Sequence, residues 1–289
     1  MISIILILLF VFSVLSVPVC HGVISGLYLY GMKIFPGLFI SFILTNILVR
    51  ILQQKNINNP WILVITGLMT GFPNGAYICS WYNKNNPENR LGDMLAGIIN
   101  IPSPAFLISY VYINILEKCI SLPMFLALTY TPVILCSYMA ILLFRDKNNK
   151  KDNAPHIKND KKLIFHFFEE AVDSSINTAL KLGAYVIIFS VIVNIIMHFS
   201  QSNTAGLLIS YLFEISNGLA IIKNAGIPMN ITVLLTVLLD AFGGVCIIMQ
   251  TKSICSSYIS IKKYIYQKLV LCIVCLLYTS PSPRDRSLS

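Results

Sequence analysis

The sequence predicts an all-α polytopic membrane protein, an inverted repeat with two re-entrant or broken helical segments. Of its 289 residues, 56% are hydrophobic and 11% are charged, and the mean hydropathy is +0.75. Apolar runs that could cross about 30 Å of hydrocarbon lie at 2–19, 34–50, 62–82, 94–115, 121–144, 181–199, 205–222 and 228–250, with a last one starting near 264. Because these runs lack the period-2 alternation of barrel strands, we expect helices.

The composition argues against several classes of protein. The net charge of +9 comes from basic residues between the apolar runs, which is typical of membrane orientation signals and argues against a nucleic-acid partner. The eight cysteines lie mostly within apolar runs, so we expect neither a disulfide framework nor a zinc site. Without a Walker loop, an HExxH or a GxSxG motif, or metal spacing among the histidines, we expect no enzyme and no cofactor.

The two ends of the chain need separate treatment. Residues 1–20 predict an N-terminal membrane helix rather than a secretory signal, because no basic region precedes the apolar run. At the other end, CLLYTSPSPRD translates one frame of a transposon-derived sequencing adapter. We therefore expect 275–289 to be an artefact, and the natural chain to be truncated near Val274, within its last helix.

The basic loop sets the predicted topology. Residues 145–162 contain seven Lys/Arg and no apolar run, which indicates a cytoplasmic loop. It opens a region, 145–180, that continues as an amphipathic, interfacial helix over 161–183. A segment 62–82 that enters and leaves on one side puts all the neighbouring basic residues in the cytoplasm, namely Arg50, Lys55, Lys84 and Arg90. A fully crossing segment would split them between the two sides.

The stretch TGFPNGAY within 62–82 supplies a local reason for a break. Glycine costs about 1 kcal/mol and proline about 3 kcal/mol in a helix interior, and broken backbone at membrane depth survives only beside protein or a water-filled cavity. Gly71, Pro73 and Gly75 therefore indicate a cavity. The alternative is a kinked, spanning helix in which Gly67, Gly71 and Gly75 form a close-packing face.

The other half contains a similar pattern, which is either a second copy or a chance similarity of two helices that contain Gly and Asn. FPNGAYI (72–78) and the helix broken at 100–104 are similar to ISNGLAI (215–221) and the helix broken at 240–244. Counted from the cytoplasmic loop, the preceding helices at 34–50 and 181–199 run in opposite directions. Interrupted segments in two inverted halves, 21–144 and 181–274, predict a secondary transporter whose site lies where the breaks meet.

Polar and break-forming residues inside the apolar runs are the candidate solute site. They are Pro73, Asn74, Gly75, Asn100, Ser103, Pro104, Glu214, Asn217, Gly218, Asp240, Gly243, Gly244 and Gln250. Ionisable groups at membrane depth are expensive, so Glu214 and Asp240 are candidate sites for a coupling ion, H⁺ or Na⁺, or carboxyls kept neutral by burial. Half-helix N-termini after Asn74 and near Ser103 would favour an anionic solute. The oligomeric state stays open.

Four motifs carry a family resemblance. GFPNGAYIC, NIPSPAFLISYV, FEISNGL and FGGVCIIMQTKSI occur in this order. Together they resemble the sporulation integral membrane proteins of the YlbJ type, also called stage V sporulation protein V. These belong with the nucleoside-recognition Gate-domain proteins and are distantly similar to concentrative nucleoside transporters. The resemblance covers about residues 20–274.

The resemblance implies a function as well as a fold. It implies transport of dipicolinic acid, a small aromatic dicarboxylate, across the outer forespore membrane of a sporulating bacterium, from the mother cell. A non-transporting scaffold of a sporulation complex and a nucleoside-type transporter are the alternatives.

Overall fold

The computed structural model describes residues 2–55, 59–87, 90–143, 161–200, 204–255 and 258–279, and its regular structure in these ranges is helical. In these ranges, five helical segments are long and apolar enough to cross a membrane: Ser16–Leu52, Leu91–Ile115, Leu122–Leu143, Phe168–Ser200 and Met229–Cys255. The predicted all-α class is therefore confirmed. The length and composition of these segments indicate an integral, polytopic membrane protein.

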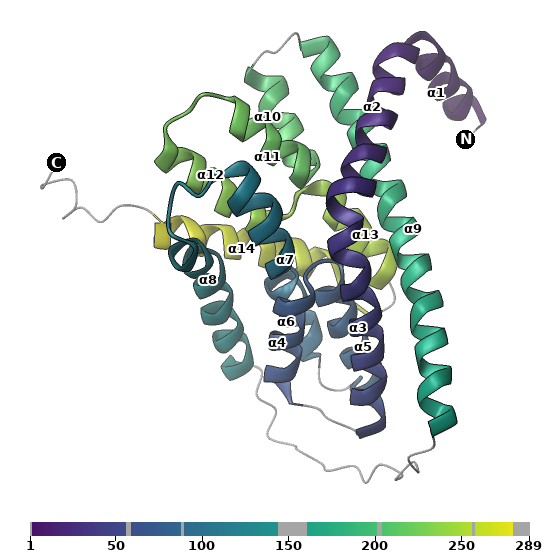
Figure 1. Cartoon of the computed structure of the whole chain (residues 1–289), viewed down its shortest axis with the longest axis vertical. Helices are drawn as coiled ribbons and strands as arrows, with labels where there is room; N and C mark the ends of the chain where they lie inside the picture. The colour runs from purple at the N-terminus through teal and green to yellow at the C-terminus, as the bar shows by residue number, and fades with distance from the viewer. Residues whose placement is uncertain are drawn as a thin grey trace, which may run out of the picture.

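Two long helical segments form an antiparallel pair along one side of the molecule (Figure 1). The first joins α2 (Ser16–Tyr28), the π-helical η1 (Leu29–Ile34) and α3 (Phe35–Lys55), and the second is α9 (Lys161–Ser200). Gly22 lies against Val191, whereas Arg50, near the other end of the pair, is ion-paired with Glu170. A Cβ added to Gly22 would lie 2.5 Å from the Val191 Cα, so the helices approach to backbone contact.

The helix bounds at this side differ from the predicted runs. The apolar run 2–19 is divided between α1 (Ile2–Val14) and α2, which continues far beyond residue 20. At about 1.5 Å per residue, the 13 residues of α1 are too short to cross the hydrocarbon. The predicted interfacial helix over 161–183 and the span 181–199 are one continuous helix, α9.

Short helices dominate the rest of the first half. They are α4 (Pro60–Thr70), α5 (Asn74–Asn85), α6 (Leu91–Ile99), α7 (Pro104–Phe106) and π-helical η2 (Leu107–Ile115), before the uninterrupted α8 (Leu122–Leu143). α4 packs against α5, and α5 packs against α6. Along α6 every residue except Met94 is buried, which places this helix at the centre of the molecule.

Five helices follow α9 in the described second half of the chain. They are α10 (Thr204–Phe213), α11 (Ile215–Asn224), α12 (Met229–Phe242), α13 (Gly244–Cys255) and α14 (Ile261–Thr279). α10 packs against α11, and α11 packs against α12. α14 crosses the other helices in Figure 1 and contacts α6, α8 and α12.

The segment 275–289, which we expected to be an artefact, lies partly within the described residues. α14 continues through the predicted boundary near Val274 to Thr279, and Cys275 is buried. Residues 280–289 lie outside the described residues, as do residues 144–160 of the predicted cytoplasmic loop.

Candidate functional site

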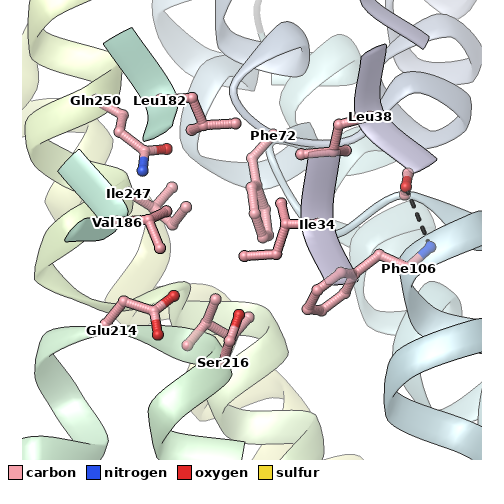
Figure 2. Close-up of a pocket in the computed structure, with 12 residues that line it drawn as sticks. Ile34, Leu38, Phe72, Phe106, Leu182, Val186, Glu214, Ser216, Ile247 and Gln250 are labelled. Carbon is pink, nitrogen blue, oxygen red and sulfur yellow. Dashed lines mark hydrogen bonds between the residues drawn. The ribbon is translucent and has the colours of Figure 1, made fainter. Parts of the chain in front are cut away.

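Three helix breaks contribute residues to one narrow cavity (Figure 2). Phe72 comes from the break between α4 and α5, Ser103 from the break between α6 and α7, and Glu214 from the break between α10 and α11. The other lining residues are Ile34, Leu38, Phe106, Leu182, Val186, Ile215, Ser216, Ile247 and Gln250. The cavity has room for only about one water molecule.

The break between α4 and α5 has a backbone cause. Gly71 ends α4 with a φ of +70°, a conformation that residues with a Cβ rarely adopt. A Cβ there would also lie 2.4 Å from the Ser103 backbone nitrogen. The Phe72 N–H donates to the Ile101 carbonyl at 3.0 Å, so this tip is joined to the break between α6 and α7.

The break between α10 and α11 is built around Glu214. This residue has extended backbone and is the N-cap of α11, where its carboxylate accepts a hydrogen bond from the Asn217 N–H at 2.7 Å. Its side chain is buried and points toward the cavity beside Ser216 (Figure 2). Among the residues that line this cavity, Glu214 is the one with an ionisable side chain.

The break between α6 and α7 and the break between α12 and α13 also have local causes. Ser103 caps α7 by accepting from the Phe106 N–H at 3.3 Å, and Pro104 occupies the first helical position. Gly243 and Gly244 have φ of +83° and +82° between α12 and α13. A Cβ on Gly244 would lie 3.2 Å from the Phe213 carbonyl, so α13 begins against the α10–α11 tip.

Asn100 is a structural tie rather than a cavity residue. Its side-chain oxygen accepts from the Ala76 N–H at 3.2 Å, and its amide donates to the Tyr264 hydroxyl at 2.8 Å and to the Thr251 hydroxyl at 3.3 Å. These bonds join α5, α13 and α14 at the end of α6. The buried amide is therefore satisfied within the protein.

The structure separates the predicted site residues, and Asp240 is described below. Ser103, Glu214 and Gln250 meet at the cavity. Asn74 is buried near it with an unpartnered amide nitrogen, whereas Asn217 donates to the Ser190 hydroxyl and lines a separate surface pocket. The packing residues, which support the breaks, are Pro73, Gly75, Asn100, Pro104, Gly218, Gly243 and Gly244.

One expectation about the breaks needs correction. The Asn-Gly pairs do not themselves break the helices, because Asn74 begins α5 and Asn217 lies in the first turn of α11. The breaks fall just before them, at 71–73 and at Glu214. The free N–H groups expected after Asn74 are also occupied, since Gly75 and Ala76 donate to Gly71 and Asn100.

Asp240 lies apart from the cavity. It is fully buried near the end of α12, and neither carboxyl oxygen has a hydrogen-bond partner among the described residues. Tyr130 of α8 and Tyr211 of α10 lie within electrostatic reach of it. The two acidic candidates therefore occupy separate environments, and only Glu214 faces the cavity.

Several lining residues were not predicted as site residues. Phe72 and Ser216 flank predicted positions, and their motifs contained the signal. Leu182 and Val186 come from α9, where a continuous apolar helix offers no local signal of a cavity. No protein-family model, curated protein or solved structure matches this chain.

Proposed function

We propose that this protein is a membrane transporter or facilitator of a small anionic solute. The observation that carries the proposal is the meeting of three helix breaks at one cavity that holds a single carboxyl, Glu214. Breaks of this kind at membrane depth are tolerated beside a cavity, and in secondary transporters they form the solute site. Glu214 is the coupling residue in this proposal.

The proposed role of Glu214 follows from its two functions in the structure. Its carboxylate caps α11 and also faces the cavity. An anion entering beside an ionised carboxyl would be repelled, so we propose that Glu214 takes up a proton when the solute binds. Proton uptake and solute entry would then be coupled at one side chain, with no metal cofactor.

The proposal includes a re-entrant, inverted arrangement. α4 and α5 span about 17 and 18 Å, each less than the hydrocarbon thickness, and they pack on each other. α10 and α11 have the same relation. The antiparallel packing of α3 on α9 supports opposite directions for the two halves.

For the solute, the resemblance to YlbJ-type sporulation proteins supports dipicolinate, and the outer forespore membrane is the proposed location. The observed cavity is too narrow for this dicarboxylate and lacks a lining basic residue. Binding would therefore require the hairpins to separate. Nucleoside uptake is the competing activity to be measured beside it.

The test is uptake of radiolabelled dipicolinate or uridine into vesicles that contain the purified full chain and carry a pH gradient. We expect dipicolinate uptake above that of empty vesicles, and at least a tenfold loss in Glu214→Gln, which retains the capping oxygen but cannot ionise. Glu117→Gln, at an exposed carboxyl, is the matched control and should transport normally. Uptake equal to that of empty vesicles, or unchanged by Glu214→Gln, would contradict the proposal.

A membrane scaffold is the second candidate, because several motif glycines make close packing contacts. A Cβ added to Gly71, Gly75 or Gly218 would lie within 3 Å of an atom of a neighbouring residue. The two functions differ in water access to the cavity. In a chain with Cys20 and Cys119 replaced by serine, Ser216→Cys should react with a membrane-impermeant thiol reagent if the cavity opens, and stay unreactive in a packed scaffold.

A further inference from the structure

A buried lysine, Lys268, joins the ends of two broken helices. Its side chain lies fully buried on α14. The ammonium donates to the Asn100 carbonyl at 2.5 Å and to the Ala241 carbonyl at 2.9 Å. Asn100 directly follows α6, and Ala241 is in the last turn of α12. Lys268 therefore binds the carboxyl ends of α6 and α12, the helices that precede the α6–α7 and α12–α13 breaks.

The charge of this ammonium is balanced by backbone. A helix C-terminus carries about half a negative elementary charge, so two of them together offset about one positive charge. In the described part of the chain, the ion pairs involve other residues, and no carboxylate is paired with Lys268. Carbonyl oxygens are thus the main ligands of a buried cation.

The same kind of ligand set holds a metal cation in other proteins. In transporters with broken helices, half-helix C-terminal ends and unwound carbonyls coordinate the coupling Na⁺. Here the Asn100 side chain is held by hydrogen bonds to Tyr264 and Thr251. These bonds fix the residue, and so its backbone carbonyl is oriented before any ion binds. The site is therefore preorganised for a single positive charge.

We propose that Lys268 is a tethered cation that fills a cation site between the ends of α6 and α12. The inference rests on the proposed transport function and adds that the cycle uses no Na⁺ at this position. It separates two roles within the molecule. Lys268 holds the two helices at their carboxyl ends, and Glu214 remains the group that exchanges a proton.

The proposal predicts a new ion dependence when the lysine is removed. Lys268→Ala leaves two carbonyl oxygens and an unfilled space, which a small monovalent cation can occupy. Thermal unfolding of the full chain in detergent, followed by tryptophan fluorescence, is compared in NaCl and choline chloride at one ionic strength. We expect Lys268→Ala to lose about 5–10 °C in choline and to regain about half of that loss in NaCl.

Three other proteins complete the experiment. The unfolding temperature of the wild type should be the same in both salts. The same should hold for Lys262→Ala, which changes an exposed lysine on the same helix. Lys268→Met fills the space without a charge, so it should lose stability that Na⁺ does not restore. A Na⁺-specific shift in wild type, or equal unfolding of Lys268→Ala in both salts, would overturn the proposal.

A foldability problem has its own readout. If Lys268→Ala is recovered only from NaCl, the proposal is supported. If it is recovered from neither salt, Lys268→Ser replaces it, and a lack of Na⁺ response there overturns the proposal. These unfolding measurements need no solute. A failure of vesicle uptake would contradict the transport proposal without affecting them, so it is distinguishable from a failure of the Lys268 proposal.

Discussion

The tips of the two broken hairpins, α4–α5 and α10–α11, are fixed in different ways. The first tip is fixed by another part of the chain: Phe72 donates to the Ile101 carbonyl, and Ala76 donates to the Asn100 side chain. The second tip is closed by its own side chain, because Glu214 accepts from the Asn217 N–H within α11. One tip depends on backbone contacts, and the other depends on an ionisable group.

This difference separates support from chemistry in the proposed site. Protonation cannot alter the backbone bonds that anchor the first tip. At the second tip, the same carboxyl caps the helix and faces the cavity, so a change in its charge acts on the helix end directly. In the proposed transporter, the first hairpin would therefore be the support and the second the responsive element.

The largest expected effect is at Gly71 in the first hairpin. Gly71→Ala places a Cβ 2.4 Å from the Ser103 nitrogen at a φ of +70°, which should destabilise the protein by about 3–5 kcal/mol. The yield of monodisperse protein in detergent measures this loss. Gly37→Ala, whose Cβ meets nothing within 4 Å, is the control. Similar yields for both variants would contradict the statement that close backbone contacts at Gly71 fix the first tip.

Asn100 and Asn217 give the next comparison, because they tie the first and second hairpins respectively. Asn100→Ala removes three side-chain hydrogen bonds in a buried position, with an expected cost of about 2–4 kcal/mol. Asn217→Ala removes one bond, to Ser190, with a cost of about 1 kcal/mol. Thermal unfolding should rank them in this order, and the reverse order would contradict the comparison.

Ser103 tests a cap that has no charge. Ser103→Ala removes the oxygen that accepts from Phe106, at an expected cost of about 1 kcal/mol. Ser103→Asn should recover most of that stability, because asparagine is also a good N-cap. Denaturant unfolding of the three proteins measures the cap. Equal stability of all three would show that Ser103 contributes through packing alone.

The smallest expected effect is a pH dependence at the C-terminal end of α11. Lys223 binds the exposed Glu117 carboxylate at 2.7 Å, and this hydrogen bond and charge lower the pKa of Glu117 below its ordinary value. A carboxyl whose pKa is lower in the folded state than in the unfolded state stabilises the folded state at pH values above its unfolded-state pKa. This stabilisation is lost as the pH falls through the folded-state pKa. The small stability difference between wild type and Glu117→Gln should therefore shrink from pH 7 toward pH 3. A difference that grows on acidification would contradict the assignment.

The sequence predicted the breaks well because their causes are local. Gly71, Pro104 and the pair Gly243–Gly244 lie at or beside helix ends, as the low helix propensity of glycine and proline favours. The rule is not general, because Pro132 lies inside α8 without ending it. Helix bounds at α2 and α9 were less predictable. The run 2–19 contains no strong breaker at Leu15, and α9 passes from an amphipathic to an apolar pattern without interruption.

The site was predictable only where a polar residue marked it. Glu214, Ser103 and Gln250 stand out in apolar runs and do line the cavity. Lys268 did not stand out, since it lies where the sequence contains other lysines at the start of α14. Its burial depends on the carboxyl ends of α6 and α12, which only the tertiary structure brings together.

The close antiparallel contact between α2 and α9 restricts sliding of one helix along the other. Gly22 and Gly26 meet Val191 and Ile187 so tightly that a shift of one residue along the pair would drive a side chain into the facing backbone. The same two helical segments form one wall of the cavity. If the protein is the transporter proposed above, this wall is expected to stay fixed while the hairpins opposite it move to admit the solute.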